Sequence, residues 1–134
     1  MPEVNLLAVV VATMAAFVLS SIWYIVFGKA WMEYRGKAAG ATADMRKTPA
    51  WKRLAELVRS FVFSYVLACV IVLAGIRGWT AALQFGFLVW LGFPFMILSG
   101  SVLWDRVPWK LAAIHVGDWF VKVLALTVIL AIWR

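Results

Sequence analysis

Four long apolar segments, separated by polar intervals, dominate the hydrophobic pattern of the chain. They cover about residues 6–27, 57–76, 81–103 and 111–133. Each has the roughly 20 residues that a helix rising about 1.5 Å per residue needs to cross about 30 Å of hydrocarbon. The pattern predicts an all-α, polytopic membrane protein. We expect one domain over residues 1–134, with four transmembrane helices in an antiparallel bundle.

The first and third segments each carry a further expectation. The first is expected to be a retained span, because it is too long for a signal-peptide core, lacks a basic leader and precedes aromatic residues instead of a small-residue cleavage site. In the third, Pro94 lacks a backbone donor and crowds the carbonyl four residues earlier, which predicts a kink. A structural kink is favoured over a transport hinge, since membrane helices tolerate proline.

Composition supports the membrane assignment and limits the partners. The chain is 66% hydrophobic and 14% charged, which excludes an ordinary soluble domain. Its net charge of +7 comes from basic residues between apolar segments, so we expect anionic lipid headgroups as partners and no nucleic acid. With one Cys and one His, we expect no disulfide, metal site or cofactor.

The distribution of basic residues predicts orientation. The connection at about 28–56, with its flanking helix ends, and the third connection carry most of them: Lys29, Arg35, Lys37, Arg46, Lys47, Lys52, Arg53, Arg59, Arg106 and Lys110. The opposite side has only Arg77 and Arg134. The positive-inside rule puts the basic connections in the cytoplasm and both termini outside. Trp23, Trp104 and Trp109 are expected at the cytoplasmic boundary. Residues after Pro49 are predicted to start either a short interfacial helix or a loop.

Small residues predict where the helices pack. In lipid they permit close backbone approach, so a ridge of them marks a contact face. The first helix has such a ridge at four-residue spacing: Ala8, Ala12, Ala16 and Ser20. Ser60, Ser64 and Ala68 on the second helix, and Ala113 and Gly117 on the fourth, are expected to face it.

The fourth segment contains three ionisable residues, His115, Asp118 and Lys122, whose spacing places them on one helix face. Lys122 is expected about 16 Å into the membrane, where a charge costs about 3 kcal/mol. Asp118 offers a partner for Lys122, and Arg59 on the second helix is expected within reach of Asp118. Two interpretations stay open. The residues form a proton or ion path, or a satisfied ion pair that fixes the helix against its neighbours.

The sequence resembles a family of small bacterial membrane proteins known as domain of unknown function 1761. The resemblance rests on Asn5, Trp23, Tyr24, Gly28 and Trp31 around the first helix, the run from Gly86 to Phe93, Trp104 and Asp105, and Ile114 to Gly117. It implies a four-helix protein of the bacterial cytoplasmic (inner) membrane without an established activity.

These features predict a non-enzymatic structural or accessory protein that binds lipid or a larger membrane complex. No phosphate loop, zinc spacing or nucleophile with a base partner is evident in the sequence. The alternative is a small channel or proton-coupled carrier, formed as a homo-oligomer, with the polar stripe lining its path.

Overall fold

The protein is all-helical over the residues that the computed structural model describes, which are 1–30, 33 and 49–133. The elements are α1 (Leu6–Val26), α3 (Ala50–Leu73), α4 (Trp79–Trp90), the π-helical turn η2 (Leu91–Phe95), α5 (Met96–Trp104) and α6 (Trp109–Ile132). α4, η2 and α5 form one uninterrupted helix, so four helices are long and apolar enough to cross a membrane. The predicted all-α fold with four candidate spans is confirmed, and the chain is a small multi-pass membrane protein.

Pro94 lies inside η2, the single π-helical turn between α4 and α5. Because proline has no N–H and its ring crowds the carbonyl four residues earlier, a regular α-helical bond cannot form there. A wider turn accommodates the proline. The predicted kink itself stays a prediction.

The second span begins earlier than its apolar segment indicates. α3 starts at Ala50, directly after Pro49, and continues to Leu73 without interruption. Residues 50–56 are therefore the first turns of the spanning helix and not a separate interfacial helix. Within the predicted connection, Trp31, Arg35, Lys37, Arg46 and Lys47 lie outside the described residues.

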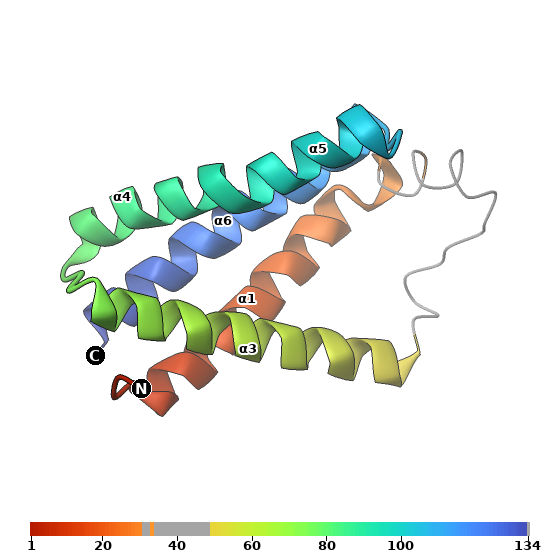
Figure 1. The fold of residues 1–134 in the computed structure, drawn as a ribbon. Coiled ribbons are helices and arrows are strands. Elements are labelled where there is room, and N and C mark those ends of the chain that lie inside the picture. The colour runs from red at the N-terminus through yellow and green to blue at the C-terminus, as the bar shows by residue number, and fades with distance from the viewer. Residues whose placement is uncertain (31–32, 34–48, 134) are drawn as a thin grey trace.

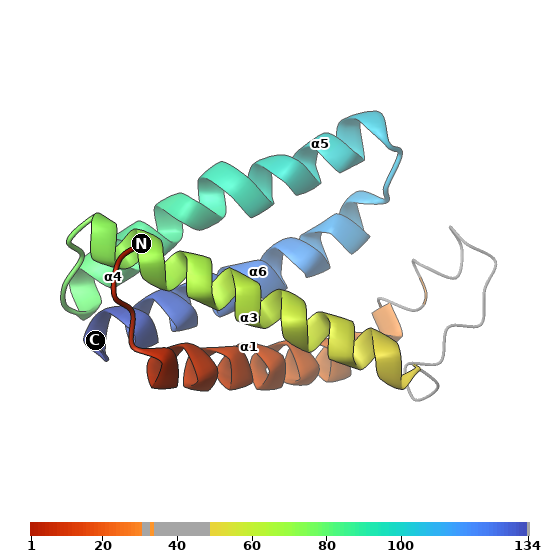
Figure 2. The same ribbon diagram turned by 60° about the horizontal axis from the view of Figure 1, so that its bottom comes forward.

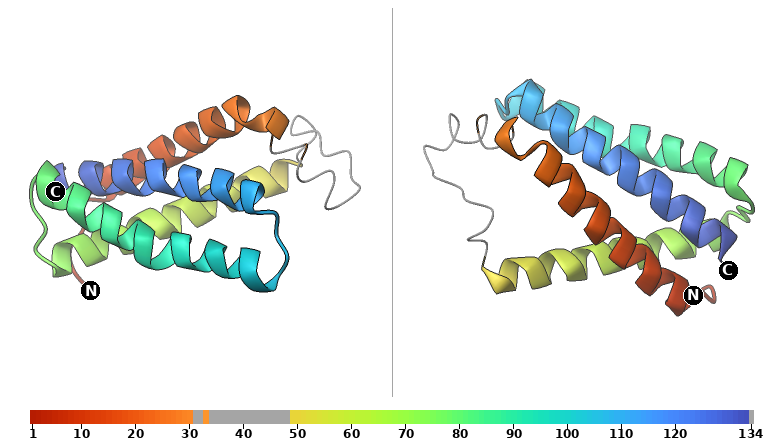
Figure 3. Two further views of the ribbon diagram at one scale, coloured as in Figure 1. Left: turned by 90° about the horizontal axis from the view of Figure 1, so that it is seen from above. Right: turned by 180° about the vertical axis from the view of Figure 1, so that it is seen from behind.

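α6 is the central helix of the bundle and contacts α1, α3, α4 and α5. Figure 1 shows both termini and the 74–78 turn at one end of the molecule, and the start of α3 and the 105–108 turn at the other. α4 packs against α6, and α5 diverges from α6 toward the 105–108 turn (Figure 2). α1 and α3 approach each other near the termini and diverge toward the opposite end (Figure 3). The bundle is thus closed at one end and splayed at the other.

The tightly packed core lies at the closed end. Small residues of α1 allow its backbone to approach α3 and α6 closely. The buried cluster comprises Ala8, Val9, Ala12, Ala16, Leu67, Ala68, Ile71, Ala82, Leu126, Leu130 and Ala131. Of the small residues predicted to pack on α6, Gly117 faces Trp23 of α1, whereas Ala113 is exposed and Ala112 is buried in its place.

Candidate functional site

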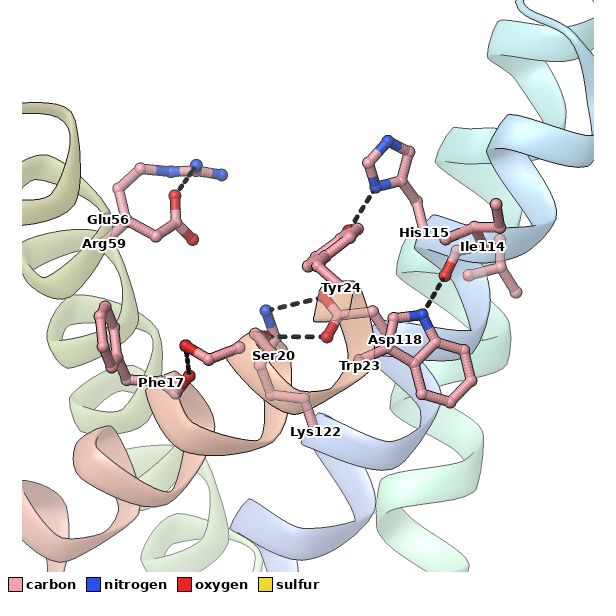
Figure 4. Close-up of polar contacts among 12 residues, drawn as sticks. Phe17, Ser20, Trp23, Tyr24, Glu56, Arg59, Ile114, His115, Asp118 and Lys122 are labelled. Atoms are coloured by element: carbon pink, nitrogen blue, oxygen red, sulfur yellow. Dashed lines mark hydrogen bonds and ion pairs between the residues drawn. The ribbon is translucent and has the colours of Figure 1, made fainter. Parts of the chain in front are cut away.

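A buried ion pair on α6 is the centre of the candidate site. Asp118 and Lys122 are only 4% and 5% exposed. The Lys122 Nζ lies 3.3 Å from the Asp118 Oδ2. The hydroxyl of Ser20, at the end of the α1 small-residue ridge, donates to Oδ1 at 2.8 Å (Figure 4). Nζ also lies 4.0 Å from the centroid of the Trp119 ring. Both charges are thus compensated locally, which offsets the desolvation that burial imposes.

A second polar contact joins the same two helices nearer the splayed end. The Tyr24 hydroxyl and the His115 Nδ1 share a hydrogen bond of 2.5 Å, in which the donor depends on the imidazole tautomer. Tyr24 is one turn from Ser20 on α1, and His115 is one turn from Asp118 on α6. Two successive rungs therefore connect the same faces of α1 and α6 (Figure 4).

Two tryptophans bind backbone carbonyls of α6 from opposite neighbours. Trp23 Nε1 of α1 donates to the Ile114 carbonyl at 3.0 Å. Trp90 Nε1 of α4 donates to the Val116 carbonyl at 2.9 Å. Both indoles satisfy their N–H within the membrane span, where an unpaired donor is costly. Sequence reasoning treated Trp23 as a boundary marker and missed this role.

The predicted contact between Arg59 and Asp118 is not formed. Arg59 instead pairs with Glu56, one turn earlier on α3, at 2.6 Å. A carboxylate three residues away on the same helix is nearer than one on a neighbouring helix that diverges from α3. The side chains of Arg59 and Glu56 are 70% and 49% exposed, so this pair lies at the open end of the bundle.

A cavity of about 490 Å³ connects these groups. Its walls come from α1, α3, α5 and α6, and its lining includes His115, Asp118, Lys122, Glu56 and Arg59. All three residues of the predicted polar stripe, together with Arg59, therefore face one cavity at the splayed end. Leu98 and Trp119 also line an apolar groove of about 540 Å³ between α3 and the α4–α5 helix.

The remaining residues predicted from the family resemblance lie at or near the ends of helices. Asn5 caps α1, where its Oδ1 accepts hydrogen bonds from the backbone N–H groups of Leu7 and Ala8. Gly28 follows the end of α1, Trp104 ends α5 at 84% exposure, and Asp105 caps α5 with its N–H bonded to the Ser101 carbonyl. In the described part of the chain, no three His, Cys, Asp or Glu residues are grouped as a metal site would require.

Comparison with known proteins gives a family match. A family described as "Protein of unknown function (DUF1761)" matches residues 7–131, nearly the whole chain. No curated protein and no solved structure matches it.

Proposed function

Since the chain belongs to the family named domain of unknown function 1761, whose description gives no activity, we propose a function from the geometry of the site. We propose that the protein is a non-enzymatic structural or accessory protein of the bacterial cytoplasmic membrane, and that it binds membrane lipid. The observation that carries this proposal is the polar cavity at the splayed end, which adjoins an apolar groove within the spanning region. Such a combination suits an amphipathic ligand.

The pairing of the charged groups supports a structural role for the polar stripe. Asp118 accepts from Lys122 within α6 and from Ser20 of α1, and the Ser20 bond joins α1 to α6. Breaking a buried pair of this kind leaves an uncompensated charge, at a cost of about 3–5 kcal/mol. The stripe therefore holds the helices that form one wall of the cavity.

The ends of the molecule support binding of anionic headgroups on the cytoplasmic side. Lys29, Lys52, Arg53, Arg106 and Lys110 lie at or near the splayed end, whereas Arg77 lies in the turn at the closed end. Two tryptophans beside them have lysines over their rings: Lys52 on Trp51 at 5.6 Å and Lys110 on Trp109 at 5.7 Å. Such Trp–Lys pairs are typical of a membrane–water boundary. The asymmetry favours a cytoplasmic splayed end and external termini.

Native mass spectrometry of the protein, extracted gently from its own membrane, tests the proposal. We expect retained phospholipid on the protein, alone or within a complex with another membrane protein. Complete loss of lipid under conditions that preserve lipid on a control membrane protein would contradict it.

The second candidate is a small oligomeric channel or proton-coupled carrier. It is favoured by one observation, that His115, Asp118 and Lys122 all line the same cavity. Single cysteines at these positions, in a Cys69→Ala background, would all react with a polar thiol reagent if the cavity were an aqueous path. Cysteines at Val116 and Val121, which do not line this cavity, are the matched controls. Proton flux into proteoliposomes that Lys122→Met abolishes would favour this candidate over the first.

A further inference from the structure

The polar cavity and the apolar groove lie end to end along α3. The cavity is lined by Glu56, Arg59 and Ser60 near the start of the helix, and the groove by Phe63, Val66, Leu67 and Val70 further along it. From Arg59 to Val70 the helix rises about 16 Å at about 1.5 Å per residue. Polar groups therefore lie toward the membrane boundary, and the apolar groove extends from them toward the closed end.

The far wall of the groove is apolar and comes from α4, η2, α5 and α6. It includes Phe85, Val89, Phe93, Pro94, Ile97 and Trp119. Leu98 and Trp119 line both spaces, so they form the junction between them. A single molecule with a polar head and a hydrocarbon chain matches this sequence of surfaces.

The charged side chains at the cavity indicate which lipid headgroup it would bind. Besides His115 and Tyr24, the ionisable side chains that line the cavity are two acids, Glu56 and Asp118, and two bases, Arg59 and Lys122. The Asp118–Lys122 pair is buried, and opening it would leave a costly isolated charge. The Glu56–Arg59 pair is solvent-exposed, and exposed pairs contribute little to stability, so it can exchange partners at small cost.

We infer that this composite site takes one zwitterionic phospholipid of the phosphatidylethanolamine class. Its phosphate accepts hydrogen bonds from Arg59, its ammonium donates to Glu56, and one acyl chain lies in the groove past Leu98 and Trp119. This inference rests on the proposed lipid-binding function and names the lipid class and the site.

The carboxylate of Glu56 distinguishes this lipid from an anionic one. A phosphatidylglycerol phosphate would compete with Glu56 for Arg59 and leave that carboxylate without a cation. A phosphatidylethanolamine head gives both side chains a new partner, because its phosphate pairs with Arg59 and its ammonium with Glu56. Charge-assisted hydrogen bonds of this type are among the stronger ones in proteins. The basic residues at the membrane boundary, by contrast, suit anionic headgroups without an internal site.

Lipid titration monitored by native mass spectrometry tests which headgroup the site prefers. Delipidated full-length protein is titrated with phosphatidylethanolamine and, separately, with phosphatidylglycerol. We expect the wild type to prefer phosphatidylethanolamine, and Arg59→Gln to weaken that binding about tenfold or more. Glu56→Gln should weaken the binding of phosphatidylethanolamine and strengthen the binding of phosphatidylglycerol. Arg77→Gln, which changes an exposed arginine in the turn at the closed end, away from this cavity, is the control and should change the binding of neither lipid.

A second pair of variants tests the groove. Leu98→Trp fills the junction, whereas Met96→Trp adds the same bulk two residues away at a position that lines neither space. We expect Leu98→Trp alone to abolish binding, and water-soluble glycerophosphoethanolamine to bind at least about tenfold more weakly than the intact lipid. An equal loss of phosphatidylethanolamine binding in both tryptophan variants would overturn the inference. So would binding of the water-soluble head as strong as that of the intact lipid.

The outcomes separate this inference from the proposed function. If the wild type retains lipid but Glu56→Gln and Leu98→Trp have no effect, the protein binds lipid elsewhere and the inference is wrong. If the wild type retains no lipid of either class, the proposed function fails with it.

Discussion

The indole ring of Trp23 lies directly over Gly117. A Cβ built on Gly117 would be 2.8 Å from Cη2 of that ring and nearer still to Cζ2, closer than real side chains approach. The same indole donates its Nε1 hydrogen to the Ile114 carbonyl, one turn earlier on α6. Glycine within a helix costs about 1 kcal/mol relative to alanine. Here the absence of a side chain at Gly117 leaves room for the Trp23 ring. That contact fixes α1 against α6 beside the polar site.

Substituting Gly117 tests this contact. We expect Gly117→Ala to destabilise the protein by about 1–3 kcal/mol, because the ring must move and its hydrogen bond is strained. Gly100→Ala is the control, since a Cβ at that position would meet no atom within 4 Å beyond its two chain neighbours and the nearby backbone of its own helix. That variant should be unchanged or up to about 1 kcal/mol more stable. Thermal unfolding in detergent measures both, and equal stability of the two variants would contradict the packing account.

The buried ion pair should show strong coupling. We expect Lys122→Met alone to destabilise by about 3–5 kcal/mol, since it leaves the Asp118 carboxylate buried without its cation. The double variant Asp118→Asn with Lys122→Met removes both charges and should recover most of that loss. A double-mutant cycle from unfolding measurements checks this. A double variant as unstable as the sum of the single ones would argue against a structural pair.

Ser20 and Ser21 provide a matched pair of neighbouring hydroxyls. Ser20 donates to the Asp118 carboxylate, whereas the exposed Ser21 donates only to the Phe17 carbonyl of its own helix among the bonds described. Ser20→Ala should therefore cost about 1.5–3 kcal/mol, as expected for a hydrogen bond to a charged group. Ser21→Ala should change stability by less than about 0.5 kcal/mol. Comparable effects in the two variants would show that the Ser20 bond contributes little.

Gly86 forms the corresponding close contact between α4 and α6. A Cβ there would lie 2.6 Å from Thr127 Oγ1, which is fully buried. We expect Gly86→Ala to destabilise by about 1–3 kcal/mol through overpacking. Adding Thr127→Ala makes room for the methyl group, so the double variant should lose less stability than the two single changes together. Strict additivity in the unfolding measurements would show that the two positions do not interact.

The transmembrane helices could be predicted because each is an apolar run of spanning length. The start of α3 shows the limit of that signal. Residues 50–56 are too polar to extend the apolar segment, yet they are helical because Pro49 precedes a sequence compatible with helix. The π-helical turn at Pro94 likewise follows from proline chemistry, although the sequence does not show which local geometry accommodates it.

The polar site could be predicted within one helix but not between helices. The spacing of Asp118 and Lys122 is enough to pair them on α6. The partners Ser20, Trp23 and Tyr24 depend on how α1 rotates and crosses α6, which sequence spacing does not specify. Arg59 illustrates the consequence. Its pairing with Glu56 follows from their spacing within α3, whereas the predicted contact with Asp118 depends on how α3 crosses α6.

The most direct test of lipid binding is thermal unfolding of the purified, delipidated protein with and without added phosphatidylethanolamine. A ligand that binds only the folded state stabilises it by about 2.7 kcal/mol at a hundredfold excess over the dissociation constant. The account predicts a clear rise in Tm for the wild type and for Met96→Trp, and none for Leu98→Trp. An unchanged wild-type Tm at saturating lipid would contradict it.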